Sequence, residues 1–269
     1  MIALLETKTE KLSGIQRIRR RLKRESNIAF YEENVMGMRV LRVVMKLSRD
    51  ESSRALRKSV ERVMEGLDRA YVDKVCFRQD FPMKSDVTEN DFKELDDKTL
   101  WRIKAAEIAV KAVPKGEAVL LMTESVGKYE EAALIKLCGG FRHVALLSDS
   151  GAASFCRHMC ERTGISIVEK PTENAVLRAD AAVIFDVPEK TRLGDRCVAV
   201  ADGTLPAGIY GNERYVENAG FIYTGKLRET IPEGYPPEPI ISAAVENGLC
   251  GAEEISLGDI KISKKTREK

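Results

Sequence analysis

The sequence predicts an α/β protein with a doubly wound, mostly parallel C-terminal domain that follows a smaller α+β domain. From Glu117 onward, short and nearly continuous apolar segments alternate with helical segments, as expected of parallel strands buried on both faces. Before that point the expected elements come in the order β-α-β-β-α-β. At 269 residues the chain is long enough for two domains that each bury a core.

Residues 1–80 are expected to form the smaller domain, which the element order predicts to be ferredoxin-like. Period-two patterns indicate strands at 2–5, 27–32, 38–47 and 71–77, with a turn at 34–37. Two series of apolar residues at helical spacing indicate helices: Leu12, Ile15, Ile18 and Leu22 in 10–24, then Leu56, Val60, Val63 and Leu67 after Ser52 and Ser53.

Residues 81–115 are expected to be a linker and a connecting helix. The stretch 79–98 is polar and rich in turn-forming residues. A helix is predicted over 99–113, where Pro114 and Gly116 end it.

Residues 116–230 are expected to form the Rossmann-like domain. Strands are predicted at 118–122, 143–148, 165–168, 181–185 and 197–201, and helices at 128–139, 152–163 and 172–178. Residues 231–269 follow as an extended proline-rich arm, a short helix at 239–247 and a solvated basic tail.

Composition favours a cytoplasmic protein. The six cysteines are scattered without a CxxC pair, no signal peptide is recognisable, and no apolar run reaches the ~20 residues of a membrane span. No metal site is expected, because Cys156 and Cys160 share a helix face from which His158 points away. The basic run IQRIRRRLKR carries an apolar stripe, so RNA binding through the N-terminal domain is disfavoured.

Residues 118–188 resemble the NAD(P)-binding domain of the shikimate dehydrogenase and glutamyl-tRNA reductase group. The resemblance lies in KLCGGFRHVALLSDSGAASFCRHMCERTGISIVEK followed by AVLRADAAVIFDVP. It implies a nucleotide cofactor, with NAD favoured and oxidoreductase chemistry. The catalytic residues of that group have no counterpart in residues 1–115, so no catalytic residue is assigned.

The turn after the first strand of this domain, LLMTESVGKYEEAAL, is the expected phosphate position. Pyrophosphate binds to backbone N–H groups at a helix start, where glycines let it approach. Here Gly127 is the single glycine, so the glycine loop is degenerate. Thr123, Ser125, Gly127 and Lys128 would face phosphate, and the alternative is an ordinary strand-to-helix connection.

Two further positions complete the expected cofactor site. Asp149 follows the second strand, where a carboxylate accepts ribose hydroxyls; alternatively, Asp149 or Ser150 caps the next helix. Ser148, Ser150 and Gly151 could instead form an anion nest. Asp186 ends the fourth strand and would face the reactive end of the cofactor.

The sequence therefore leads to one function and two alternatives. The first is binding of an NAD-type nucleotide by a Rossmann-like protein with oxidoreductase ancestry. The second is a regulatory or assembly protein that keeps the fold without a cofactor and acts through a protein partner or a homo-oligomer. The third is RNA binding by the basic N-terminal domain.

Overall fold

The computed structural model describes residues 1–10, 27–48, 52–89, 92–149, 152–187, 189–202, 205–211 and 214–264. The chain divides into two compact units. Unit 1 contains Met1–Asp97 and Thr224–Gly251, and unit 2 contains Lys98–Tyr223 and Ala252–Lys269.

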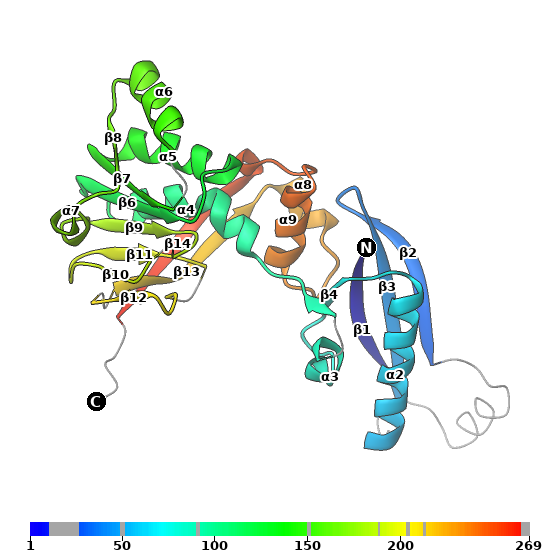
Figure 1. The fold of residues 1–269 in the computed structure, drawn as a ribbon. Coiled ribbons are helices and arrows are strands. Elements are labelled where there is room, and N and C mark those ends of the chain that lie inside the picture. Colours follow the sequence, from blue (N-terminus) through cyan, green and yellow to red (C-terminus); the bar gives the residue numbers. More distant parts are fainter. Residues whose placement is uncertain are drawn as a thin grey trace, which may run out of the picture. The chain divides into compact units, whose positions relative to one another are not determined.

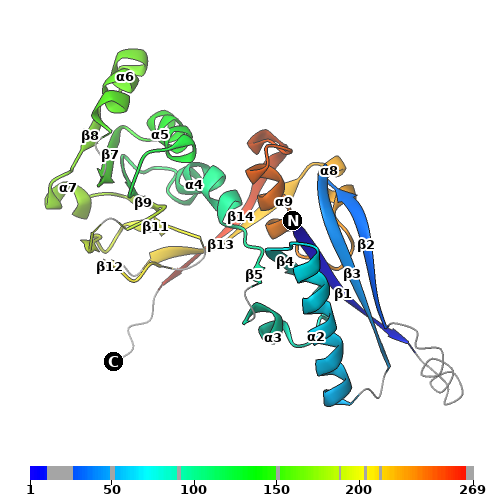
Figure 2. The same ribbon diagram turned by 45° about the vertical axis from the view of Figure 1, so that its right-hand side comes forward.

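Unit 1 is built on a five-stranded sheet with the order β2-β3-β1-β4-β5. Its strands are β1 (Ile2–Glu10), β2 (Ile28–Val35), β3 (Met38–Ser48), β4 (Lys74–Phe77) and β5 (Lys93–Glu94). Helix α2 (Ser53–Arg69) runs beside these strands (Figure 2), and its buried stripe joins the same core as Leu5 and Val43. Ser52 caps the helix, because its side chain accepts the N–H of Ala55.

The unit 1 sheet contains the predicted strands, but the directions of neighbouring strands differ from those in a ferredoxin-like sheet. Strand β1 runs parallel to both β3 and β4, and only the β2–β3 hairpin is antiparallel. In an antiparallel ferredoxin-like sheet, β1 would oppose its neighbours. Strand β1 ends at the same edge of the sheet at which β2 begins, so β2 runs antiparallel to β1. Helix α2 connects β3 to β4 and returns the chain to the opposite edge, so β4 runs parallel to β1 and β3. Of the helix predicted at 10–24, Glu10 is the last residue of β1, and residues 11–24 lie outside the described part of the chain.

The segment expected to be a linker is largely part of unit 1. It contains α3 (Lys84–Thr88) and β5, and it buries Phe81, Val87 and Phe92 in the unit 1 core. The helix predicted at 99–113 is present as α4 (Lys98–Ala112), which belongs to unit 2.

The segment 224–251 meets the second face of the unit 1 sheet. Residues 225–230, which were expected in the Rossmann-like domain, form α8 (Gly225–Thr230) of unit 1. The short helix predicted at 239–247 is present as α9 (Pro237–Glu246), which begins two residues earlier, within the stretch expected to be an extended arm. The prolines are compatible with α9 because Pro236 is its N-cap and Pro237 its first residue, where no backbone N–H is needed. Gln79 donates its N–H to the Gly234 carbonyl, and Lys74 pairs with Glu246 at 3.2 Å.

Unit 2 is a Rossmann-like domain around a seven-stranded sheet with the order β14-β13-β11-β9-β6-β7-β8 (Figure 1). The strands are β6 (Ala118–Thr123), β7 (His143–Ser148), β8 (Ile167–Glu169), β9 (Ala181–Ile184), β11 (Val198–Val200), β13 (Arg214–Tyr223) and β14 (Ile255–Lys264). From β8 to β13 all pairings are parallel, and the order is the 3-2-1-4-5-6 of dinucleotide-binding domains.

Both faces of the unit 2 sheet are buried, which confirms the doubly wound prediction. Val119 and Leu121 face a core shared with α4, α5 (Lys128–Gly140) and α6 (Ala153–Thr163). Leu120 and Met122 face a second core that includes Val176 of α7 (Glu173–Leu177). A separate pair, β10 (Thr191–Arg192) with β12 (Ile209–Tyr210), and η1 (Ala252–Glu254) complete the described elements of unit 2.

The sequence predicted a solvated basic tail at the C-terminus, and the structure corrects this. Residues 261–264 (KISK) belong to β14, which pairs antiparallel with β13, and residues 265–269 of the expected tail lie outside the described part of the chain. Neither strand shows a continuous apolar run, because most of their residues are at least partly exposed. Among the described helices, none combines the length and apolar character needed to cross a bilayer.

Candidate functional site

Three residues predicted for the cofactor site lie at one edge of the unit 2 sheet. Thr123 is the last residue of β6 and pairs with Ser148, the last residue of β7. Asp186 follows β9 by two residues, and β9 is the other neighbour of β6. Ligands of open α/β sheets bind at this carboxyl edge, where the strand order reverses. Here that switch point lies between β6 and β9.

The side chains of Thr123 and Asp186 meet across the switch point. The Thr123 hydroxyl lies 2.8 Å from the carbonyl oxygen of Ser125 and 3.4 Å from Oδ2 of Asp186. Thr123 is 1% exposed, so its hydroxyl is held inside the turn. The rim of the crevice is therefore tied together by side chains of the protein itself.

Arg102 on α4 extends this network. Its Nη2 lies 3.1 Å from Oδ1 of Asp186 and 3.5 Å from the Phe185 carbonyl, and its guanidinium lies 5.6 Å from the Phe185 ring centroid. Its Nη1 is 3.9 Å from Oε1 of Glu130. Arg102 thus bridges two carboxylates that come from the ends of β9 and the start of α5.

The start of α5, the predicted phosphate position, holds a carboxylate. Gly127 is the N-cap, and its N–H donates to Oε2 of Glu130 at 3.0 Å. Glu130 is only 6% exposed, whereas Ser125, Gly127 and Lys128 are exposed. A phosphate at this turn would meet the negative charge of Glu130 next to the N–H group that it needs.

Asp149 is exposed directly after β7. Helix α6 starts at Ala153, and its N-cap, Ala152, makes no side-chain capping bond. Among the described residues, Asp149 therefore does not cap α6. Ser150 and Gly151, and with them the anion nest, lie outside the described residues.

A cavity of about 120 Å³ opens beside Arg102, between α4 and the carboxyl ends of β9 and β11. Its size is of the order that accommodates one small ring. It is lined by aromatic, cationic and acidic side chains, namely Trp101, Phe185, Lys98, Arg102, Asp186 and Asp202, with small apolar residues of the two strands. The arrangement suits a polar ring held against an aromatic wall, with charged groups of both signs to orient it.

Two residues of this network, Arg102 and Glu130, were missed from the sequence. Arg102 lies on α4, which was predicted to be a connecting helix outside the Rossmann-like domain. Glu130 did carry a signal, because a Glu three residues after an N-cap is the pattern of a capping box.

RNA binding by unit 1 would use aromatic side chains for base stacking, and four aromatic residues lie on or next to its strands: Phe30, Tyr31, Tyr71 and Phe77. Phe77 is only 2% exposed and belongs to the unit 1 core, whereas Phe30, Tyr31 and Tyr71 are exposed. The basic run of residues 15–24 lies outside the described part of the chain.

No family model matches the chain, and no curated protein matches it. Solved structures with partial similarity include a probable ornithine cyclodeaminase from Bordetella pertussis Tohama I, at 16% identity over 39% of this chain and 37% of that one, with a TM-score of 0.27. The Δ1-pyrroline-2-carboxylate reductase of Thermococcus litoralis, in complex with NADH and L-proline, gives 14% identity over 39% and 36%, with a TM-score of 0.26. An archaeal alanine dehydrogenase dimer with bound NAD gives 20% identity over 38% and 34%, with a TM-score of 0.28.

The chain spans little more than a third of the length of these proteins. With TM-scores below 0.3, the similarities carry no argument about function, and the fold assignment rests on the strand order of unit 2. None of the three belongs to the shikimate dehydrogenase and glutamyl-tRNA reductase group. The closer resemblance to that group stays a prediction.

Proposed function

We propose that unit 2 binds an NAD-type nucleotide at the switch point between β6 and β9 and that it serves an oxidoreductase reaction. The observation that carries the proposal is the 3-2-1-4-5-6 strand order, with Thr123 and Asp186 facing each other where the order reverses. In this arrangement Asp149 takes the ribose hydroxyls at the end of β7. The cavity beside Arg102 takes the ring at the other end.

Arg102 is the cation best placed to receive a phosphate. Its side chain is 37% exposed and lies between Asp186 and Glu130, so it can turn from either carboxylate toward an anion in the crevice. Guanidinium groups bind phosphate oxygens in pairs, which adds orientation to charge neutralisation. Ser125 and Lys128 would complete the phosphate contacts from the rim.

Glu130 supports the second candidate, a regulatory or assembly protein without a cofactor. Its buried carboxylate already uses the Gly127 N–H and faces Arg102. The crevice is then closed by internal ion pairs, and unit 2 serves as a scaffold for a protein partner or a second copy. The two candidates differ in one property, the affinity for nucleotides.

The test is thermal unfolding of the purified chain with NAD, NADH, NADP and ATP at millimolar concentration. A ligand at 100 times its dissociation constant adds about 2.7 kcal/mol to the free energy of unfolding. For a domain of this size that corresponds to a rise of several degrees in Tm. Calorimetric titration of any nucleotide that raises the Tm then gives its dissociation constant.

Three variants make the test specific. Asp149→Ala should remove the response to NAD, and Arg102→Gln should weaken it, whereas Glu161→Ala, an exposed acid on α6, should leave it unchanged. If no nucleotide raises the Tm of the parent chain, the NAD proposal is wrong and the scaffold candidate takes its place. A response that survives Asp149→Ala would place the nucleotide elsewhere.

A further inference from the structure

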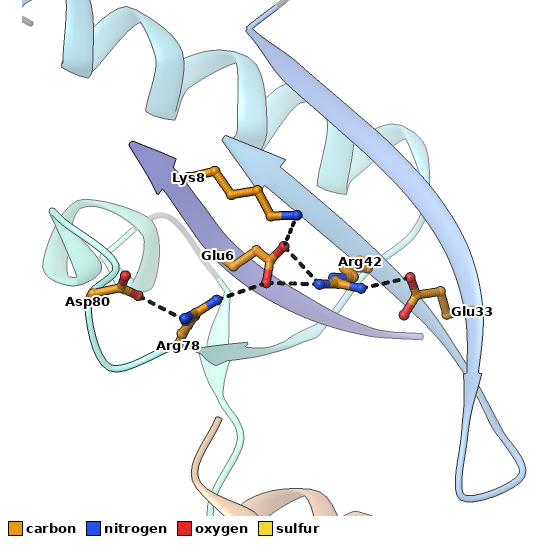
Figure 3. Close-up of polar contacts among 6 residues, drawn as sticks. All are labelled: Glu6, Lys8, Glu33, Arg42, Arg78 and Asp80. Atoms are coloured by element: carbon orange, nitrogen blue, oxygen red, sulfur yellow. Dashed lines mark hydrogen bonds and ion pairs between the residues drawn. The ribbon is translucent and has the colours of Figure 1, made fainter. Parts of the chain in front are cut away.

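Unit 1 buries a carboxylate in the middle of its sheet. Glu6 on β1 is 0% exposed and points away from the α2 core, because its neighbour Leu5 points into it. An ionised group at such a position needs several charged or hydrogen-bonding partners. Figure 3 shows that these partners converge on Glu6 from neighbouring strands and from the residue that follows β4.

Three cationic side chains surround this one carboxylate. Arg42 of β3 donates from Nη2 to both oxygens of Glu6, at 2.9 and 3.1 Å. Arg78, directly after β4, lies 3.5 Å from Oε2, and Lys8 lies 3.8 Å from Oε1. Two further carboxylates complete the cluster, since Glu33 pairs with Arg42 and Asp80 with Arg78 (Figure 3). The cluster thus holds three cations and three carboxylates, and Glu6 is the one among them whose side chain is almost fully buried.

Two buried polar groups beside this cluster lack a partner among the described residues. They are the hydroxyl of Tyr235 and Nε of Arg42. Tyr235 is 5% exposed, and burial together with the charge of Glu6 raises the pKa of its hydroxyl, which is therefore protonated at neutral pH. Both groups can donate a hydrogen bond, so the missing partner is an acceptor.

The backbone of the loop before α9 is shaped to approach the cluster. Gly234 has a φ of +85°, and a Cβ at this position would lie 2.7 Å from Nε of Arg78. The loop thus brings Tyr235 close to the arginines. Solvent still reaches the rim, because the side chains of Arg42, Arg78 and Lys8 are 29%, 33% and 56% exposed.

Stability alone does not account for this arrangement. A buried ion pair is often no more stabilising than well-packed apolar residues, and orphaned donors add a cost. Partly exposed cations beside buried donors that lack a partner are instead suited to an oxygen-bearing anion.

We propose that Arg42, Arg78, Lys8 and Tyr235 form a binding site for a small oxyanion, a phosphate or carboxylate group, on the second face of the unit 1 sheet. An oxygen of the anion accepts hydrogen bonds from the Tyr235 hydroxyl and from Nε of Arg42. Lys8 faces the anion from the rim, and Glu6 holds the arginine heads in place. This site is independent of the nucleotide site proposed for unit 2.

The test is calorimetric titration and thermal unfolding of the full chain with inorganic phosphate, sulfate and succinate, each compared with sodium chloride at equal ionic strength. A saturable rise in Tm with at least one oxyanion, absent with chloride, is expected. Phosphate or sulfate binding identifies a tetrahedral anion as the ligand group, and binding of succinate alone identifies a carboxylate.

Tyr235→Phe removes the hydroxyl and keeps the ring. The unliganded variant should be as stable as the parent or more stable, while its affinity for the anion falls about tenfold. Lys8→Gln should also weaken binding. The matched controls, Tyr210→Phe in unit 2 and Lys58→Gln on α2, should leave it unchanged, since Tyr210 and Lys58 are both exposed.

Two results would overturn the proposal. One is the absence of any oxyanion response beyond that of chloride in the parent chain. The other is a Tyr235→Phe variant with a lower Tm without ligand and an unchanged anion affinity, because the hydroxyl would then be held by a structural water.

Discussion

The N–H of Gly127 donates a hydrogen bond to the carboxylate of Glu130 across 3.0 Å. This contact places a negative charge of the protein at the helix start where a dinucleotide-binding domain normally holds pyrophosphate. Arg102 faces the same carboxylate at 3.9 Å. The effect of replacing Glu130 on nucleotide affinity therefore tests whether the phosphates of a nucleotide bind at this turn.

Glu130→Gln is expected to raise the affinity for NAD about tenfold, since it removes a like charge at the phosphate position but keeps an acceptor for the Gly127 N–H. Loss of the ion pair with the partly exposed Arg102 should cost at most about 1 kcal/mol of stability. Calorimetric titration of parent and variant measures both the affinity and its change. An unchanged or lower affinity would mean that the phosphates do not approach this turn.

Gly194→Ala should destabilise the protein by about 1–3 kcal/mol, because the new Cβ would lie 2.1 Å from the carbonyl oxygen of Leu177. The matched variant Gly139→Ala adds a Cβ with no atom within 4 Å, inside α5. It should stabilise the protein by about 0.5–1 kcal/mol through helix propensity. Denaturant unfolding of the two variants gives opposite signs, and equal signs would contradict the packing described for Gly194.

Arg42→Ala should cost about 3–5 kcal/mol, because it removes the Nη2 donor that bonds both oxygens of the buried Glu6 carboxylate. Arg39, three residues earlier on the same strand, makes a similar 2.7 Å pair with Glu32, but both side chains are mostly exposed. Arg39→Ala should therefore change stability by less than about 1 kcal/mol. Chemical denaturation of both variants checks the contrast, and comparable losses would argue against a special role of burial.

Buried cysteines should make the protein less stable at alkaline pH. Burial raises the pKa of Cys76 and of Cys197 to about 12, whereas an unfolded thiol titrates near 8.5. Between these values the unfolded chain has lost protons that the folded chain keeps, so the free energy of unfolding falls as pH rises from about 9 toward 12. Below about pH 8 the two thiols add no pH dependence.

Thermal unfolding from pH 8 to 11 measures this loss, and replacing both cysteines with alanine should reduce its slope. At pH 8, a thiol reagent should label the exposed Cys160 well before Cys76 and Cys197. Rapid labelling of the two buried thiols in the folded protein would contradict their placement.

The strands of unit 2 that are buried on both faces were predictable, because β6 and β9 are almost wholly apolar. Strands β13 and β14 were not, since most of their residues are at least partly exposed and only pairing with each other defines them. The direction of β1 relative to its neighbours in unit 1 could not be predicted either. The order of elements indicates which strands are adjacent, but it does not determine at which edge of the sheet the next strand begins.

For the candidate site, sequence reasoning found the strand ends but not what connects them. Thr123 and Asp186 were expected because each follows an apolar strand, and the structure brings their side chains together. Arg102 was missed because its helix lies more than 80 positions before Asp186, and no local spacing links the two. The Tyr235 loop was hidden in a proline-rich stretch whose helix start was mistaken for an arm.

The two-segment composition of unit 1 has a consequence for synthesis on the ribosome. The first 97 residues leave the exit tunnel long before residues 224–251, which contact the second face of their sheet. Until then Leu4, Val40 and Cys76 on that face lack their native cover. Unit 1 must therefore wait, partly assembled, while most of unit 2 is translated, and this interval is when chaperone binding or misassembly of the nascent chain would occur.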